Sequence, residues 1–547
     1  MRRSRSSLVG IVTVAGMLLA AGVAAAVSGA PKHASTPRSV AAAKAPAAGP
    51  RLHLVRDVKT GKDKLGSQIP GGPDPIQDYI QPDTQTEPSI AVNPRNPKNA
   101  VAAYQEGRIA DGGDATNGYA VTFDAGKTWK YGELPGLTTY PGQGGVMERA
   151  SDAVVAFGPD NVVYANSLVF DYSANDGLRS GIVVNVSKNG GRTWSPPVYL
   201  QDDLVGGLND KNWIVVDNGD GPGHHKGRVY VVWDRVAPVL VNYCDHDCDQ
   251  LANWLPDFQS IPDVVFPGQG IGAYPVIQKD GGLGIVMDSL SGGVPMPTGS
   301  DEPEVDAGSD QIVYLTAPAA GTTVWPAPLV FTPPIEIAVN MTNGTPAQRA
   351  SDGLPAAAVD PDSGTLYAVW DDGRYRADNT NDAVISRSVD NGLHWSTPQR
   401  VNTGPTSDYV NHYNVVVAVG KKGIVHVSYR QRDQSGPGPL YTPVIDTYYQ
   451  ASFDGGSTFT APLKVNKKPA NPWYGAFSRN GTFEGDYNQI ASAGQYTYIT
   501  RCQGAPAFAG EPQPLIKNPN NSNTIVLTEA GKGHQHQSNW VSVIEYS

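Results

Sequence analysis

The sequence predicts an all-β fold built from a repeated unit of short strands. Glycine and proline are abundant, with 61 and 45 copies in 547 residues, and this indicates many turns. Apolar residues make up 40% of the chain, enough for a sizeable core, whereas charged residues make up only 17%. Similar turns and similar strand starts recur along the chain. The composition argues against an all-α protein, a disordered acidic tail and a basic nucleic-acid binder.

The first thirty residues have the organisation of an export signal. Three arginines within the first five residues precede an apolar run over 8–27, and small residues near 26–30 suit cleavage. We therefore expect a secreted, extracellular protein. An uncleaved N-terminal anchor is the alternative.

The rest of the chain divides by composition into two parts. Residues 31–81 begin as an Ala/Pro-rich, low-complexity tether and continue as an N-terminal segment, and residues 82–547 carry the repeats. Loss of the three arginines lowers the net charge from −11 to about −14. Such a surface repels polyanions, so we expect no nucleic-acid partner, and we expect a monomer without a membrane span in its mature form.

Three cysteines, Cys244, Cys248 and Cys502, are too few for a disulfide scaffold. The close pair Cys244 and Cys248 indicates a small disulfide loop or a plain surface loop, and a metal knot is the less favoured alternative. Cys502 is then unpaired, or it pairs with one of the other two.

Four segments share the pattern Ser/Thr-x-Asp/Asn-x-Gly-x-Thr-Trp or a close variant of it. Each lies between two apolar strands, which predicts a hairpin turn. The Asp or Asn side chain can accept hydrogen bonds from turn N–H groups, and glycine supplies a positive φ. The closing aromatic ring can pack between neighbouring sheets. The segments are Thr122–Trp129, Ser187–Trp194, Ser388–Trp395 and Ser452–Phe459.

These four segments resemble the Asp-boxes of the sialidase-like BNR β-propellers, and the resemblance covers most of residues 82–547. It implies a β-propeller fold and the activity of an exo-glycosidase. A second repeat gives the number of blades, because apolar strand starts recur every 60 to 80 residues. Seven starts predict seven four-stranded blades, with six, the usual sialidase number, as the alternative. The starts lie at 88, 152, 213, 274, 354, 414 and 487.

The repeat assigns the loops to two rims. The four repeated turns lie on a rim of short turns and have a structural role. Function is expected on the opposite rim, because long loops over a rigid scaffold commonly carry it. The long loops are expected at 106–117, 170–179, 235–260, 289–310, 372–381, 431–445 and 503–521.

The resemblance implies a tyrosine nucleophile, an acid/base aspartate and an assisting glutamate. Tyr487 opens the last strand start, which is similar to where the family places its tyrosine. Asp111 or Asp114 stands in a loop resembling the one that carries the family's aspartate. Glu302, or its neighbour Glu304, is the candidate glutamate. The alternative for each is a packing or solvated role.

The resemblance also implies three arginines that bind a substrate carboxylate. Five arginines reach the long-loop rim, and their alternative role is salt bridging. No Arg-Ile-Pro occurs, and Glu87 stands where the family begins its clamp, which argues against cleavage of sialic acid. The segment 149–152 recurs as 349–352, consistent with internal duplication. The five arginines are Arg149, Arg349, Arg374, Arg430 and Arg501.

No cofactor is expected to be required. Asp217 and Asp220 offer oxygen ligands in one turn, so a calcium ion is possible, although a bare turn is favoured. No nucleotide-binding loop, serine-triad signature or HExxH helix occurs.

Two functions follow from the sequence. The first is a secreted carbohydrate-active enzyme related to the sialidase superfamily, hydrolysing a glycosidic bond with a tyrosine nucleophile and an aspartate acid/base. The second is a non-catalytic propeller that binds an extracellular glycan or a protein such as a glycoprotein at the long-loop rim. The missing first arginine favours binding, and Tyr487 with the first-blade loop favours catalysis.

Overall fold

A computed structural model shows an all-β structure within the compact unit Gly49–Ser547. Regular structure in its described part consists of strands and six single 3₁₀ turns. The model describes residues 51–61, 65, 80–171, 179–203, 209–235, 239–256, 259–260, 270–289, 310–345, 348–351, 353–434, 444–478, 481–505, 512–518, 521–531 and 534–546. The predicted signal peptide and most of the tether lie outside these residues.

Four separate sheets of four strands each follow one another along the chain, and each is an antiparallel meander. The alternating apolar residues of these strands form the interfaces between successive sheets. The first two sheets are β10(Asp210–Val216), β11(Val229–Asp234), β12(Val239–Cys244), β13(Gln259–Ser260), and β14(Gly270–Ile277), β15(Leu283–Ser289), β16(Gln311–Ala317), β17(Ile335–Val339). The other two are β19(Ala356–Val359), β20(Leu366–Asp372), β21(Asp382–Ser388), β22(Gln399–Arg400), and β23(Val410–Val419), β24(Val425–Asp433), β25(Ile445–Ser452), β26(Leu463–Lys464).

A twelve-stranded sheet holds the two ends of the described chain together. It comprises three runs of four strands, which are joined to one another only at the pairs Asp114–Ala150 and Thr84–Gln537. The runs are β2(Ile80–Val92), β3(Ala100–Ile109), β4(Asp114–Thr122), β5(Lys130–Glu133); β6(Arg149–Phe157), β7(Val163–Asp171), β8(Arg179–Ser187), β9(Val198–Asp203); and β29(Gln489–Ala493), β30(Tyr496–Gly504), β33(Gln537–Tyr546), β1(Leu52–Lys59).

The remaining elements are small. A three-stranded sheet and a two-stranded sheet lie beside the last run of four strands. Their strands are β18(Gln348–Arg349), β27(Ala476–Ser478), β28(Gly481–Phe483), β31(Leu515–Asn518) and β32(Asn521–Leu527). The 3₁₀ turns are η1(Pro159–Asn161), η2(Leu251–Asn253), η3(Ala320–Thr322), η4(Lys421–Gly423), η5(Pro472–Tyr474) and η6(Glu529–Gly531).

The first strands of successive groups contact one another in a closed cycle, which is the arrangement of a β-propeller. In chain order the strands of the cycle are β2, β6, β10, β14, β19, β23 and β29, and β29 contacts β2 again. Every predicted strand start lies in one of these strands or directly before it. The sheet assignment of the described residues gives five sheets of four or more strands, so it confirms neither predicted blade number.

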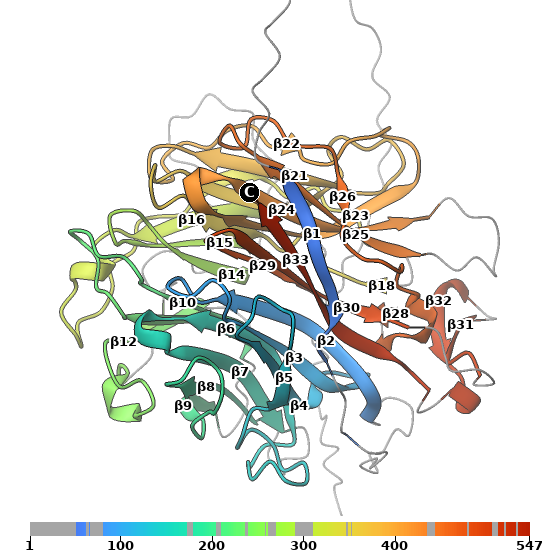
Figure 1. The fold of residues 1–547 in the computed structure, drawn as a ribbon, viewed down its shortest axis with the longest axis horizontal. Coiled ribbons are helices and arrows are strands. Elements are labelled where there is room, and N and C mark those ends of the chain that lie inside the picture. The colour runs from blue at the N-terminus through green and yellow to red at the C-terminus, as the bar shows by residue number, and fades with distance from the viewer. Residues whose placement is uncertain are drawn as a thin grey trace, which may run out of the picture. The chain divides into compact units, whose positions relative to one another are not determined.

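The N-terminal strand β1 completes the last group of the cycle. It runs antiparallel to the C-terminal strand β33, with Leu52 opposite Tyr546 and Lys59 opposite Trp540. Figure 1 shows blue β1 beside dark red β33. The two ends of the described chain are thereby fastened to each other.

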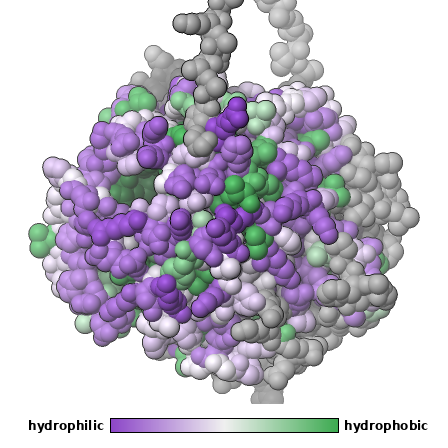
Figure 2. All heavy atoms as spheres, viewed as in Figure 1, coloured by the Kyte–Doolittle hydropathy of each residue, from purple (hydrophilic) through white to green (hydrophobic). Residues whose placement is uncertain are grey.

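The hydrophobic core lies between the sheets. Strand residues such as Val231, Val369 and Val427 are fully buried there. The face drawn in Figure 2 is mainly hydrophilic, and its hydrophobic side chains form small separate patches. No helix in the described part of the chain is long and apolar enough to cross a membrane.

The four repeated turns have one hydrogen-bond pattern, and each joins the third and fourth strands of a group. In the first turn the hydroxyl of Thr122 donates to Asp124 at 2.8 Å, and the same hydroxyl accepts from Gly126 N–H at 2.9 Å. The carboxylate of Asp124 in turn accepts from the N–H of Thr128 at 2.9 Å. Each of the four turns thus joins two antiparallel strands.

Closing aromatic rings of these turns pack on the preceding sheet, as predicted. Trp194 lies edge-on to Tyr119 and Trp395 edge-on to Tyr314, each with ring centroids 5.5 Å apart. The predicted long loop at 106–117 is wrong: β3 and β4 continue to Ile109 and from Asp114, so only four residues form the turn. The strands extend because buried polar residues such as Thr116 and Asn117 remain in the antiparallel ladder.

Cys244 and Cys248 form a disulfide, and Cys502 is a free, buried cysteine. The small disulfide loop is therefore the correct alternative among those left open by the sequence.

Candidate active site among the inner strands

Five inner strands carry a bulge at the same place, and in three of them the bulge contains a charged residue in the left-handed region. The ladders of β2, β6 and β10 shift register at Thr86/Ser89, Ser151/Val154 and Asp210/Trp213. The residues with positive φ are Glu87 (50°), Asp152 (49°) and Lys211 (39°). Non-glycine residues rarely adopt this conformation, and bulges re-aim side chains beside functional sites.

These three bulges place charged side chains within reach of Arg349 and of two residues that lie just before the last inner strand, β29. We call this set the inner-strand cluster. It consists of Glu87, Asp152, Lys211, Arg349, Asp486 and Tyr487.

Glu87 is buried, with 3% of its surface exposed. One carboxylate oxygen accepts from the side-chain amide of Gln105, and the other accepts from the N–H of Asp486 at 3.2 Å. Burial, together with the negative charges of Asp152 and Asp486, raises the pKa of Glu87 well above its usual range. Glu87 therefore retains its proton to a higher pH than an ordinary glutamate.

Asp152 shares a hydrogen-bond partner with Glu87. Its carboxylate accepts from the hydroxyl of Ser151 at 2.7 Å and from the amide of Gln105 at 3.4 Å. The Gln105 amide thus lies between the two acids and links the first inner strand to the second.

Tyr487 packs as an aromatic residue but has a polar end without a partner. Its ring lies edge-on to Trp213 with centroids 5.3 Å apart, and the Nζ atom of Lys211 lies 3.6 Å from the ring centroid. The hydroxyl is buried and makes no hydrogen bond among the described residues. Burial, followed by the charges of Glu87 and Asp152, raises the pKa of Tyr487 well above its usual range. The resting side chain is a neutral phenol.

Lys211 and Arg349 are the two cations of the cluster. Burial lowers the pKa of Lys211, and the surrounding carboxylates act in the opposite direction. Arg349 forms a bidentate pair with Asp486, in which Nε lies 3.0 Å from both carboxylate oxygens. Its side chain keeps 38% of its surface exposed, so a ligand can still contact it.

A further acid pair borders the cluster. Asp210 and Asp234 stand opposite each other in the ladder of β10 and β11. One carboxylate oxygen of Asp234 is buried without a hydrogen bond among the described residues. Burial and the charge of Asp210 raise the pKa of Asp234 well above its usual range. Carboxyl groups therefore outnumber cations at this place.

The two predicted acid/base aspartates lie outside the cluster. Asp111 pairs with Arg149 at 2.5 Å. Asp114 is fully buried beside Thr86 and Arg108, each 3.4 Å away. Burial raises the pKa of Asp114 to about 7. The charge of Asp114 contributes to the raised pKa of Tyr487. The side chains of Thr86 and Gln105, however, lie between Asp114 and the cluster.

The five predicted arginines are engaged in ion pairs. Each is paired with an acid of its own, and only Arg349 lies in the inner-strand cluster. The other pairs are Arg149 with Asp111 (2.5 Å), Arg374 with Asp372 (2.8 Å), Arg430 with Glu484 (2.6 Å) and Arg501 with Asp57 (2.7 Å). These pairs correspond to salt bridging, the alternative role that the sequence analysis gives for the five arginines.

Glu302 and Glu304 fall outside the described residues. The predicted calcium ligands do not converge. Asp217 is buried and accepts hydrogen bonds from Gly219 N–H and His225 N–H, whereas Asp220 is exposed beside Lys226. In the described ranges no group of three or more His, Cys, Asp or Glu side chains could hold a metal.

The sequence analysis does not predict Asp152 or Lys211 as site residues. It interprets Glu87 only as a negative charge that would repel a substrate carboxylate. The repeat of 149–152 at 349–352 was a usable signal, because it marks two positions of the cluster, Asp152 and Arg349. Nothing in the spacing of Lys211 distinguishes it from an ordinary strand residue.

Comparisons with known proteins give distant matches to solved structures alone. No protein-family model matches the sequence, and no curated protein does. One structural match is a protein of unknown function from Dyadobacter fermentans, with 12% identity, 91% of this chain and 99% of that chain covered, and a TM-score of 0.42. Another is a Hadza microbial sialidase, with 13% identity, 74% and 70% covered, and a TM-score of 0.41.

A third match is the GH93 α-L-arabinofuranosidase of Fusarium graminearum, with 13% identity, 68% and 93% covered, and a TM-score of 0.40. At such identities the activity of this chain has to be argued from its own site.

Proposed function

We propose that this protein is a glycoside hydrolase that acts on uncharged glycans at the inner-strand cluster. The observation that carries the proposal is the surroundings of Tyr487. Its hydroxyl is buried and makes no hydrogen bond among the described residues, and the charges of three carboxyl groups from different parts of the chain, those of Glu87, Asp152 and Asp486, raise its pKa. Propeller scaffolds hold such groups rigidly, which hydrolysis of a glycosidic bond requires.

The roles follow from the proton affinities of the groups. Glu87, with its raised pKa, protonates the leaving oxygen as the bond to the anomeric carbon breaks. Tyr487 attacks that carbon and gives its phenolic proton to Asp152. Water then attacks the anomeric carbon, and the bond between this carbon and the Tyr487 oxygen breaks. Glu87 takes a proton from the water, and Asp152 returns its proton to Tyr487. The ammonium of Lys211 over the ring stabilises negative charge that develops on the phenol.

The charge balance of the site favours a neutral substrate. Five carboxyl groups, those of Glu87, Asp152, Asp210, Asp234 and Asp486, surround two cations. Arg349 already binds Asp486 through two N–H groups. An anionic sugar would gain little from this arginine, and the carboxylate of Asp152 would repel it.

Burial of the cluster favours a second candidate function, a non-catalytic propeller that binds glycan. Tyr487 is 7% exposed and Glu87 is 3% exposed, so a substrate must displace neighbouring groups to reach them. The same burial is expected if the charges of the cluster only stabilise the cycle of inner strands and the protein binds glycan at another place.

Three broader features belong to the proposal. We infer seven blades, supported by the closed cycle of β2, β6, β10, β14, β19, β23 and β29 and by the three four-stranded runs of the large sheet. We infer that the four repeated turns are Asp-boxes, supported by their common hydrogen bonds. The export signal supports a secreted protein that meets extracellular glycans.

The test compares two buried acids. Hydrolysis of a panel of neutral fluorogenic glycosides is measured for the natural protein, for Glu87→Gln and for Asp288→Asn. Loss of the proton donor should lower kcat/KM by about 100-fold or more. Asp288 is the matched control, because burial raises its pKa to about 8 in a different sheet, and its loss should leave kcat/KM unchanged. Equal activity of Glu87→Gln and the natural protein would refute the assignment.

A further inference from the structure

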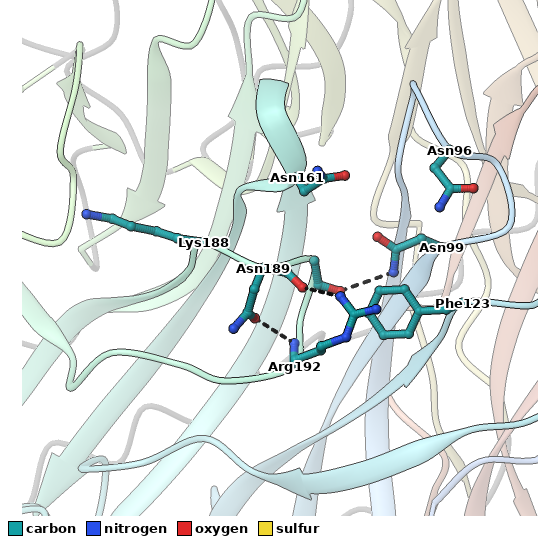
Figure 3. A pocket seen from close by; sticks show the side chains of 8 residues that line it. Asn96, Asn99, Phe123, Asn161, Lys188, Asn189 and Arg192 are labelled. Carbon is teal, nitrogen blue, oxygen red and sulfur yellow. Dashed lines mark hydrogen bonds between the residues drawn. The ribbon is translucent and has the colours of Figure 1, made fainter.

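A pocket lies between the turns of the first two four-stranded groups, lined by none of the residues of the inner-strand cluster. It has a volume of about 260 Å³. Figure 3 shows Arg192 and Phe123 on one side and Asn161 and Asn96 on the other. The remaining lining residues are Asn99, Lys188, Asn189 and Gly190.

The pocket is far from the proposed reaction centre. Its turns follow the ends of β2 and β6, and Asn93, the first residue after β2, lies six residues beyond Glu87. An extended chain of six residues spans roughly 20 Å. A ligand in this pocket therefore occupies a separate site.

Asparagine oxygens in the pocket are already engaged, which leaves hydrogen-bond donors. The Oδ1 atom of Asn161 accepts from Asn93 at 2.8 Å, and that of Asn189 accepts from Arg192 N–H at 3.0 Å. Asn96 accepts from Lys98 N–H at 3.3 Å. The side-chain NH₂ groups of Asn96 and Asn161 make no hydrogen bond among the described residues, so they are free to donate to a ligand.

Arg192 supplies an uncompensated positive charge. Its guanidinium lies 3.6 Å from the centroid of the Phe123 ring and donates to the carbonyl of Asn189 at 2.9 Å. It makes no ion pair within the described ranges. Lys188 is different, because it pairs with Asp249 at 2.8 Å and points away from the other side chains in Figure 3. No aspartate or glutamate lines the pocket.

We propose that this pocket binds an acidic sugar, a pyranose that carries a carboxylate, as in a uronic-acid unit of a glycan. The planar guanidinium of Arg192 suits a carboxylate, and the free amides of Asn96 and Asn161 suit hydroxyl oxygens. The volume is enough for one ring. The sugar part of the proposal rests on the proposed glycan function, and the carboxylate part rests on the pocket alone.

The experiment is a titration that does not depend on hydrolysis. Methyl glucuronide, methyl glucoside and acetate are added to the Glu87→Gln protein, and binding is followed by ligand NMR. We expect glucuronide to bind with a Kd on the order of millimolar, weakening as salt is added, and the other two to bind far less. Arg192→Ala should weaken glucuronide binding at least about tenfold.

Lys127→Ala is the matched control. Lys127 occupies the position of Arg192 in the first repeated turn, is exposed, and does not line the pocket. It should leave binding unchanged. Binding of glucuronide that survives Arg192→Ala, or no binding of glucuronide, would overturn the proposal. Acetate or glucoside binding equal to that of glucuronide would overturn it as well. Because the titration uses Glu87→Gln, none of these results bears on whether the inner-strand cluster hydrolyses glycosides.

Discussion

The ammonium nitrogen of Lys211 lies 3.6 Å from the centroid of the Tyr487 ring. Two backbone positions with positive φ lie at or near the two residues in contact. Lys211 adopts φ 39° in the bulge of β10, and Tyr487 follows Gly485, whose φ is 131°. A cation over a phenol ring stabilises the phenolate more than the neutral phenol. The contact therefore suits a tyrosine whose oxygen becomes anionic during attack.

Removal of this cation should slow the reaction more than it weakens substrate binding. For Lys211→Met we expect kcat to fall by about 10- to 100-fold with a smaller change in KM, because the charge acts on a group that becomes anionic only during attack. Steady-state kinetics on the neutral glycoside found active in the panel measures this. A loss confined to KM would assign Lys211 to substrate binding instead.

The buried Asp114 should make the fold less stable as pH rises. Its pKa is raised to about 7 by burial, so the folded state binds this proton more tightly than the unfolded state. Stability from this group is complete below about pH 4 and declines through pH 7. We expect Asp114→Asn to be more stable than the natural protein at pH 8 by about 2–4 kcal/mol, and nearly equal to it at about pH 3.5. Urea unfolding at both pH values measures the difference.

Equal pH dependence in the two proteins would contradict this prediction. It would mean that Arg108, 3.4 Å from Asp114, holds the carboxylate charged in the folded state.

Loss of a closing aromatic ring should harm stability and leave the site intact. Trp395 is partly buried against Tyr314, and its Nε1 donates to the carbonyl of Gly392 at 3.1 Å. Trp395→Ala should cost about 2–3 kcal/mol, less than for a fully buried ring. Thermal unfolding and glycoside hydrolysis, measured on the same sample, check both parts. An unchanged melting temperature would show that the ring is not part of the core.

A sialoside should not be hydrolysed. The arginines that a carboxylate clamp needs are paired separately with Asp111, Asp372, Glu484 and Asp57, and Glu87 stands inside the cluster. A fluorogenic sialoside is the substrate for this measurement. Sialoside turnover that disappears in Tyr487→Phe would show that arginines regroup around the substrate.

The regular part of the fold could be predicted from the sequence because its signals are local. A strand start shows as a run of apolar residues, and a turn such as Thr122–Trp129 is specified by side chains within eight residues. The pairing of Leu52 with Tyr546 could not be predicted, because it joins opposite ends of the chain and no local pattern marks it.

The site depends on contacts between distant residues, so less of it could be predicted. The sequence points to Tyr487 because this residue stands at the start of an apolar run. It also points to Arg349, as one of five arginines, but the partner Asp486 lies 137 positions away. Asp152 and Lys211 enter the site through one-residue bulges, and a shift of one residue reverses the direction of a strand side chain without changing the apolar pattern.

Formation of a bond between the sugar and Tyr487 tests the central claim most directly. The protein is incubated with the 2-deoxy-2-fluoro glycosyl fluoride of the neutral sugar that the panel identifies, and its intact mass is measured. We predict a mass increase of one fluoroglycosyl group, located on the peptide that contains Tyr487 and absent in Tyr487→Phe. Turnover of the parent glycoside with no such adduct, or with the adduct on another residue, would contradict the account.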